Sequence, residues 1–167
     1  KSKSSNNGAF SSEQQLANSG YGQAEVLVNP IHMAMVYSSF ANGGNIIMPY
    51  IEYTGDTSNI SYYKKSAFGK TVADEIKKDL IQVVENPNGT AHSVMIEGIK
   101  IAGKTGTAEI KKSQDDKEGT EIGWFNSFIA DENSKKQLLL ISMVEDVKGR
   151  GGSHYLLDKV KTIYQNY

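Results

Sequence analysis

The chain has 167 residues, a net charge of −1 at neutral pH and no cysteine. Its hydrophobic fraction of 38% and charged fraction of 22% are those of a globular protein, which excludes disorder over most of its length. The near-neutral charge gives nucleic-acid binding no support, and the absence of cysteine excludes disulfides, thiolate catalysis and cysteine metal sites. No other group of side chains has metal-ligand spacing.

The first twenty residues are rich in Ser, Asn and Gly and show no sustained apolar period. We predict a loop or frayed segment over 1–20, with a short helix at 12–17, and assign 21–167 to the remainder of the same domain. The first residue is Lys1 rather than methionine, and no signal peptide follows it. We therefore expect this sequence to be a piece of a longer protein.

A helix is predicted after Asn29, which supplies an N-cap, with Pro30 at the first helical position and a stop at 42–44. Apolar residues occupy most of its circumference, which is typical of a buried helix with neighbours on several sides. One apolar stripe at helical spacing consists of Met33, Val36, Tyr37 and Phe40, and it is widened by Ile31, Ala34 and Met35.

An extended segment interrupted by proline is expected over 45–53, and a second helix from Thr71 to the turn residues 86–89. Thr71 and Asp74 have capping-box spacing at its start. Its predicted apolar side consists of Val72, Ile76, Leu80, Val83 and Val84.

The pattern then changes to strands at 99–101, 122–129 and 137–144, with a turn at 131–134. The charged residues 111–121 are expected to form a solvated excursion between strands. An amphipathic helix over 156–167, with Ser153 as its N-cap, closes the chain. This order predicts a mixed α/β (α+β) fold in which helices cover an antiparallel sheet.

The segment Gly103-Lys104-Thr105-Gly106-Thr107-Ala108-Glu109 carries the sharpest chemical signal. A site for a peptide with a free carboxylate needs a cation and hydroxyl groups, which Lys104, Thr105 and Thr107 provide. In a strand, positions 105 and 107 face the same side, and Gly106 lets a neighbouring backbone approach closely. A strand edge can also offer an N–H to a developing oxyanion.

This segment resembles the third motif of the penicillin-binding serine acyl-enzymes, which accompanies S-x-x-K and S-D-N. Two further blocks match class B penicillin-binding proteins in the same order: "GYGQ…NP…MA…ANGG" over 20–44 and "GWF" at 123–125. The resemblance is nearest to the low-affinity enzymes of Gram-positive bacteria, a group that includes the methicillin-resistance transpeptidase. It covers nearly the whole chain and is weaker over 50–90 and after 145.

The resemblance implies the transpeptidase fold, with a five-stranded antiparallel sheet, of which this chain holds the C-terminal part. It implies a membrane-anchored D-alanyl-D-alanine transpeptidase outside the cell that cross-links peptidoglycan stem peptides, uses no cofactor or metal and is acylated by β-lactam antibiotics. Lys104 and the backbone of Thr107 (as oxyanion hole) are the implied catalytic groups. The implied substrate-binding residues are Thr105, Gly106, Thr107, Glu109, Tyr21 and Gln23. For Tyr21 and Gln23, a tight turn built on Gly20 and Gly22 explains the residues equally well.

The nucleophilic serine is not found in this sequence. Ser61-Tyr62-Tyr63-Lys64 spells S-x-x-K but sits in a polar segment typical of a surface hairpin, whereas the catalytic motif must open a buried helix. Ser4-Ser5-Asn6 spells S-x-N too close to the GYGQ block. We interpret both as coincidences. The N-terminal half of the same transpeptidase domain is therefore an expected partner, because it would supply the serine.

Three alternatives remain open. Residues 98–105 satisfy the P-loop pattern of NTPases, but the β-branched residues around Lys104 favour a strand over a helix that begins at Thr105. A penicillin-binding sensor module without turnover fits the same motifs. A carboxypeptidase or β-lactamase is disfavoured by the blocks over 29–44. We also interpret Trp124 as core packing. The transpeptidase hypothesis predicts that 102–109 pairs antiparallel with 122–129, and that strand with 137–144.

Overall fold

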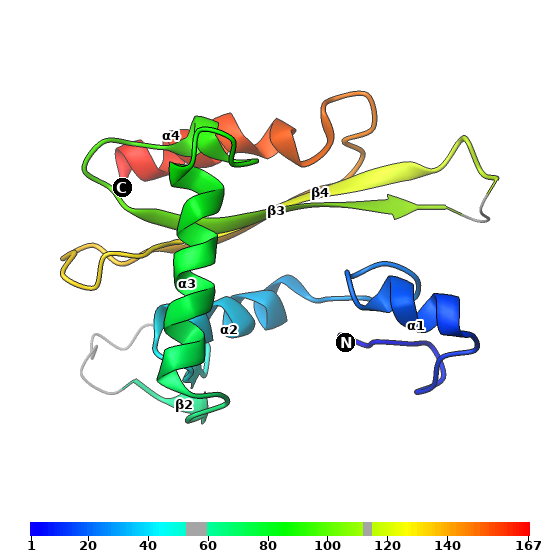
Figure 1. The fold of residues 1–167 in the computed structure, drawn as a ribbon, viewed down its shortest axis with the longest axis horizontal. Helices are drawn as coiled ribbons and strands as arrows, with labels where there is room; N and C mark the ends of the chain where they lie inside the picture. The colour runs from blue at the N-terminus through cyan, green and yellow to red at the C-terminus, as the bar shows by residue number, and fades with distance from the viewer. Residues whose placement is uncertain (53–59, 112–114) are drawn as a thin grey trace.

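The computed structural model describes residues 1–52, 60–111 and 115–167 (Figure 1). Its α-helices and strands are α1 (Glu13–Ser19), α2 (Pro30–Ala41), β1 (Ile46–Ile47), β2 (Tyr62–Lys64), α3 (Lys70–Glu85), β3 (Ile101–Ile110), β4 (Thr120–Ile129), β5 (Leu139–Val144) and α4 (Leu157–Asn166). Two 3₁₀ turns, η1 (His92–Val94) and η2 (Gly152–Leu156), precede β3 and α4. No described helix is long and apolar enough to span a bilayer.

The main sheet has the order β3-β4-β5 and is antiparallel throughout. Lys104 lies opposite Asn126, and Asn126 lies opposite Ile141 on the third strand. The predicted strand pairing and the α+β class are confirmed. Thr105 lies in the middle of β3 and does not begin a helix, so a P-loop is excluded.

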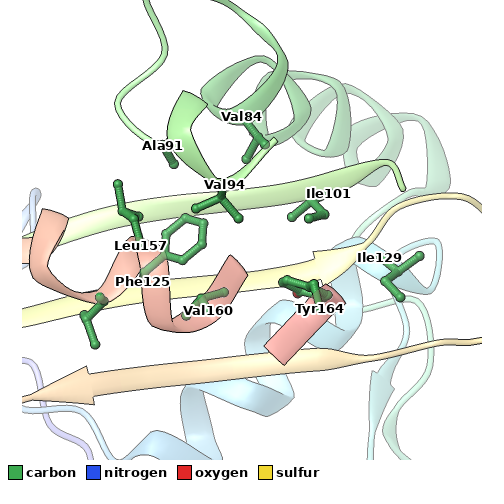
Figure 2. Packing of buried hydrophobic residues seen from close by; sticks show 10 residues of the cluster. Val84, Ala91, Val94, Ile101, Phe125, Ile129, Leu157, Val160 and Tyr164 are labelled. Atoms are coloured by element: carbon green, nitrogen blue, oxygen red, sulfur yellow. The ribbon is translucent and has the colours of Figure 1, made fainter. Parts of the chain in front are cut away.

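Helices lie on both faces of this sheet, with α4 on one face and α2 on the other, while α3 runs across the β3 side (Figure 1). On the α4 face, Phe125 and Tyr164 belong to a continuous core beneath α4 and η1 (Figure 2). The members of this core are Val84, Ala91, Val94, Ile101, Phe125, Ile129, Leu156, Leu157, Val160 and Tyr164. A smaller buried cluster on the α2 face contains Tyr37, Leu80, Ala102, Phe128 and Ala130.

The described residues bury α2 along one side only, although its apolar circumference predicts neighbours on several sides. Asn29 caps it as predicted, with its side chain accepting a hydrogen bond from the Ile31 N–H at 2.8 Å. However, its fully buried residues are Tyr37, Ser38 and Ser39, while Ile31 is 55% exposed. The helix contacts the sheet, α3 and β1 along one side, and the described residues leave much of its N-terminal half in solvent.

The capping box predicted for α3 is also wrong. The helix begins at Lys70 after Gly69, which makes no side-chain cap, so Thr71 already lies inside the helix. Asp74 instead forms an ion pair with Lys70, with the ammonium 2.7 Å from the carboxylate. The buried residues of α3 are Ala73, Lys77, Leu80 and Val84, and the predicted Val72 is 50% exposed. Lys77 can be buried because its ammonium reaches Glu132 at 2.6 Å.

The ends of other elements differ in smaller ways. Ser153 does not cap the last helix, because α4 begins at Leu157 and Ser153 lies in η2. The excursion predicted over 111–121 is shorter, since β4 already begins at Thr120; residues 112–114 lie outside the described residues. The short N-terminal helix is present as α1, capped by Ser12. The segment 45–53 is a strand at 46–47 alone, and Tyr53 lies outside the described residues.

Candidate functional site: the open edge of β3

Among the described residues, β4 is the one strand that pairs with β3, so the opposite edge of β3 is open. Two carbonyls identify the residues that face it. The Thr107 carbonyl accepts a hydrogen bond from Gln23 Nε2 at 3.4 Å, and the Thr105 carbonyl accepts one from the ammonium of Lys104 at 2.9 Å. In an antiparallel ladder the N–H and C=O of one residue point to the same side. The N–H groups of Thr105 and Thr107 therefore also face the open edge.

The hydroxyls of these two threonines lie on the α4 face of β3, and each is held by a neighbour. Thr105 is 9% exposed, and its Oγ1 lies 2.9 Å from Oγ1 of Thr90. The Thr107 hydroxyl accepts a hydrogen bond from the Ser153 N–H at 3.0 Å. Gly152 makes this approach possible, because its φ is +60° and an added Cβ would lie 2.9 Å from Thr107 Oγ1.

Lys104 belongs to the other face of the sheet, but its ammonium curls over the open edge to Thr105. Its cross-strand neighbour Asn126 is 4% exposed, and the Oδ1 of that amide has no hydrogen-bond partner among the described residues. Sequence reasoning missed Asn126, although the two-residue period of β4 places it on one face with Trp124. It also missed Thr90, which no pattern connects with β3.

A cavity of 360 Å³ lies beside this edge, between the α2 face of the sheet and residues 21–28. Its wall includes the predicted site residues Tyr21, Gln23, Lys104, Thr105, Gly106 and Thr107. The interpretation of Trp124 as core packing is wrong: Trp124 is half-buried and lines this cavity with Asn126. The aromatic residue that fills the core is its neighbour Phe125, because consecutive side chains of a strand point to opposite faces.

The charge that lines the cavity is positive. Lys104 is the one charged residue among the described residues that line it. The pKa of the nearby Tyr37 hydroxyl is raised by burial, an effect that the Asn126 side chain opposes. The site can therefore attract a carboxylate. Two cavities of 1080 and 680 Å³, beside α3 and the turn at 131–134, contain none of the predicted site residues. A cavity of 400 Å³ at the far end of β3 is lined by Glu109 but by no other predicted site residue.

The structure places the remaining predicted residues at different distances from the edge. Gln23 reaches Thr107 across 84 positions of sequence. Tyr21 lies in a turn, where Gly22 has a φ of +86° and the Tyr21 hydroxyl is 2.9 Å from Asn18 Oδ1. This segment therefore both forms a tight turn and lines the cavity. Glu109 is paired with Lys111 at 2.7 Å and does not line the cavity.

The two short motifs interpreted as coincidences lie in unrelated surroundings. Ser61 is exposed, precedes the short strand β2, and accepts the Met48 N–H through its carbonyl at 2.9 Å. Asn6 donates its backbone N–H to the Glu25 carboxylate at 2.7 Å, in a segment that pairs with Leu27. Within residues 1–52, 60–111 and 115–167, no three His, Asp or Glu side chains gather closely enough to hold a metal ion.

Comparison with known proteins adds sequence relatives to this geometry. The chain is 39% identical over 160 residues to penicillin-binding protein 3 of Bacillus subtilis, covering 96% of this chain and 23% of that protein. It is 31% identical over 140 residues to stage V sporulation protein D of the same organism, covering 80% and 21%. The chain thus spans about a quarter of the length of these relatives.

Solved structures show the same fold. The apo transpeptidase domain of penicillin-binding protein 3 from Burkholderia pseudomallei superposes with a TM-score of 0.66 at 24% identity, over 84% of this chain and 41% of that one. Penicillin-binding protein 2B of Streptococcus pneumoniae gives a TM-score of 0.67 at 18% identity, over 98% and 28%. The family model of the penicillin-binding protein transpeptidase domain matches residues 1–165. The chain belongs to this transpeptidase-domain family.

Proposed function

We propose that this chain contributes the substrate-binding edge of a serine D-alanyl-D-alanine transpeptidase that acts on peptidoglycan stem peptides outside the cytoplasm. The observation that carries the proposal is the open edge of β3, where backbone N–H groups, two threonine hydroxyls and one ammonium lie together. An extended peptide with a terminal carboxylate is complementary to this arrangement. The GYGQ and GWF blocks resemble those of class B enzymes, and the resemblance is nearest to the low-affinity type, which supports placing this enzyme there.

In this mechanism the edge binds the donor peptide in extended form. The carboxylate of the terminal D-alanine is held by the hydroxyls of Thr105 and Thr107 and attracted by Lys104. The N–H of Thr107 points outward and stabilises the oxyanion that develops when the serine attacks. The terminal D-alanine leaves, and an acceptor amine releases the acyl group from the serine. β-Lactams acylate the same serine through the same contacts.

The serine and its base come from the N-terminal half of the domain, outside this sequence. No S-x-x-K opens a buried helix within the described residues, and Ser61 is exposed and precedes β2, which pairs with β1 and not with the main sheet. The exposed apolar residues Leu27 and Val28, which line the cavity, give that half a surface to pack against. A sensor module would use the same edge without turnover.

Intact-protein mass after incubation with penicillin tests whether the nucleophilic serine lies outside this chain. The 167-residue chain should gain no mass, and the whole protein should gain one drug molecule. In the whole protein Lys104→Ala should raise the activation free energy of acylation by about 2–3 kcal/mol, because a charge-assisted contact with the carboxylate is lost. Lys78→Ala, which alters an exposed lysine of α3, is the matched control. A drug adduct on the isolated chain would refute the proposal.

The oxyanion role of Thr107 can be separated from its hydroxyl. Thr107→Ala keeps the backbone N–H and should slow acylation modestly. Thr107→Pro removes that N–H without breaking the ladder, because the group faces the open edge rather than β4. Loss of one oxyanion donor costs about 10²–10³ in rate, so the proline variant should be far slower than the alanine variant. Equal rates for the two variants would contradict the oxyanion assignment.

A further inference from the structure

The loop after α3 places Thr90 against the substrate edge. Gly89 allows the chain to turn back tightly, since an added Cβ would lie 2.3 Å from the Val83 carbonyl. The Ala91 N–H donates to that carbonyl at 3.0 Å, and a ring nitrogen of His92 lies 3.0 Å from the Val84 carbonyl. The position of Thr90 is therefore set by the backbone on both sides of it. Its own side chain is free to serve another group, and it meets the Thr105 hydroxyl at 2.9 Å.

The two hydroxyls have two protons, and their mutual hydrogen bond uses one. If Thr105 donated to Thr90, only oxygen lone pairs of Thr105 would remain for a ligand. If Thr90 donates, Thr105 keeps its own proton for the ligand. A carboxylate only accepts hydrogen bonds, so an anionic ligand is compatible with the second arrangement alone.

The neighbouring threonine shows the same arrangement. The Thr107 oxygen accepts from the Ser153 N–H, a donor that cannot reverse its direction, so the Thr107 proton is free. Thr90 is exposed, and water can hydrate its remaining lone pairs when it donates. When Thr90 donates, the Thr105 and Thr107 hydroxyls each accept a hydrogen bond from another residue of this chain, and each keeps its own proton for the ligand.

We propose that Thr90 is a positioning residue: it donates to the Thr105 hydroxyl and so directs the proton of Thr105 at the carboxylate of the ligand. This inference rests on the proposed function, in which that carboxylate binds at Thr105. Thr90 itself need not touch the ligand. Its effect should therefore depend on the negative charge of the ligand and on the presence of the Thr105 hydroxyl.

The test uses the whole protein and the second-order rate of acylation by benzylpenicillin and by its neutral methyl ester. Thr90→Val removes the hydroxyl at nearly constant shape and should slow acylation by the acid about tenfold, the effect of one hydrogen bond. Thr90→Ser should restore the rate to within about twofold. With the ester, Thr90→Val should slow acylation clearly less, by about threefold, because a neutral ester carbonyl accepts a weaker hydrogen bond from Thr105 than a carboxylate does.

A double-variant cycle with Thr105→Val supplies the second readout. If Thr90 acts through Thr105, Thr90→Val should add no loss in a protein that already lacks the Thr105 hydroxyl. Thr162→Val, which alters a hydroxyl of α4 bonded to the Asp158 carbonyl, should leave both rates unchanged. Losses that multiply in the double variant, or an equal loss with the ester, would overturn the role of Thr90.

Failure of the underlying function would look different. If Lys104→Ala and Thr105→Val slow acylation but Thr90→Val does not, the inference about Thr90 alone is wrong. If none of these variants alters acylation, the carboxylate does not bind at this edge, and both the proposed function and the inference are overturned.

Discussion

The two faces of the β3-β4-β5 sheet are completed to different degrees. On the α4 face, Phe125 and its neighbours are enclosed by α4, η1 and the end of α3 (Figure 2). On the α2 face, the buried cluster is smaller, a 360 Å³ cavity opens beside β3, and the Oδ1 of buried Asn126 has no partner among the described residues. One face is therefore a finished core, and the other is a surface that another molecule or segment can complete.

The largest expected contrast is between two adjacent residues of β4 that face opposite sides. Phe125→Ala should lower the free energy of unfolding by about 3–5 kcal/mol, because Phe125 is fully enclosed and a cavity remains. Trp124→Ala should cost clearly less, since Trp124 lines an open cavity. Urea unfolding followed by circular dichroism measures both. Equal losses would show that the α2 face is as well packed as the α4 face.

The buried hydroxyl of Tyr164 gives the α4 face a dependence on alkaline pH. It donates to Ser127 Oγ at 3.0 Å, and burial raises its pKa to about 12. A folded-state pKa above the unfolded value of 10.0 means that stability is fully present below pH 10 and is lost as pH rises toward 12.

Tyr164→Phe should remove that dependence while costing about 1–3 kcal/mol at neutral pH, because Ser127 loses its partner. Thermal unfolding at neutral pH and near pH 11 measures both effects. Tyr155→Phe, which alters a tyrosine of η2 that is not fully buried, is the control. A parallel decline of wild type and Tyr164→Phe with pH would contradict the assignment.

The ion pair between Lys77 and Glu132 ties α3 to the turn after β4 beside the α2 face. The ammonium of Lys77 lowers the pKa of the Glu132 carboxyl through a hydrogen bond at 2.6 Å. A lowered pKa stabilises the fold above the unfolded value, and this contribution disappears as pH falls through the folded value. Because Glu132 is 67% exposed, we expect Glu132→Gln to cost less than about 1 kcal/mol at neutral pH.

The difference between Glu132→Gln and wild type should vanish in acid, as measured by urea unfolding at several pH values. Glu75→Gln, which breaks the fully surface-exposed pair with Lys78, should have no measurable effect and serves as the control. A difference that persists unchanged below pH 3 would show that Glu132 contributes by packing rather than by charge.

The smallest effect is expected at Thr71, beside the α2 end of α3. A capping threonine would cost about 1 kcal/mol when replaced by alanine. Thr71 lies inside the helix, so Thr71→Ala should change the free energy of unfolding by less than about 0.5 kcal/mol. Asn29→Ala, which removes a real cap of α2, is the comparison and should cost more. A larger loss for Thr71→Ala would restore the capping box.

The sequence predicted the sheet well because its signals are local. Alternating apolar residues and a Gly-containing KTGT segment require a strand, and the turn at 131–134 sets its pairing. The helix starts were predicted only where a side chain makes the cap, as at Asn29. At Gly69 the cap has no side chain, so Thr71 offered a false signal two residues later.

Within the candidate site, the types of Lys104, Thr105 and Thr107 were readable because their chemistry is carried by one short segment. Their partners Thr90 and the Ser153 N–H were not, because they come from distant parts of the chain. Gln23 was named through the family resemblance, but its contact with Thr107 was not predicted. Burial of Asn126 likewise depends on α2 packing across the sheet. Sequence patterns show which residues favour a helix or a strand and which of them share a face. The contacts of Thr105, Thr107 and Asn126 depend instead on how distant segments pack together.

The open edge of β3 has a consequence for amide hydrogen exchange. The N–H groups of Lys104 and Gly106 are directed at β4 and should exchange slowly, whereas those of Thr105 and Thr107 face outward and should exchange quickly. Exchange rates should therefore alternate residue by residue along the KTGT segment. A peptide bound along the edge would slow the fast set and leave the slow set unchanged, so the rates themselves would report where the ligand lies.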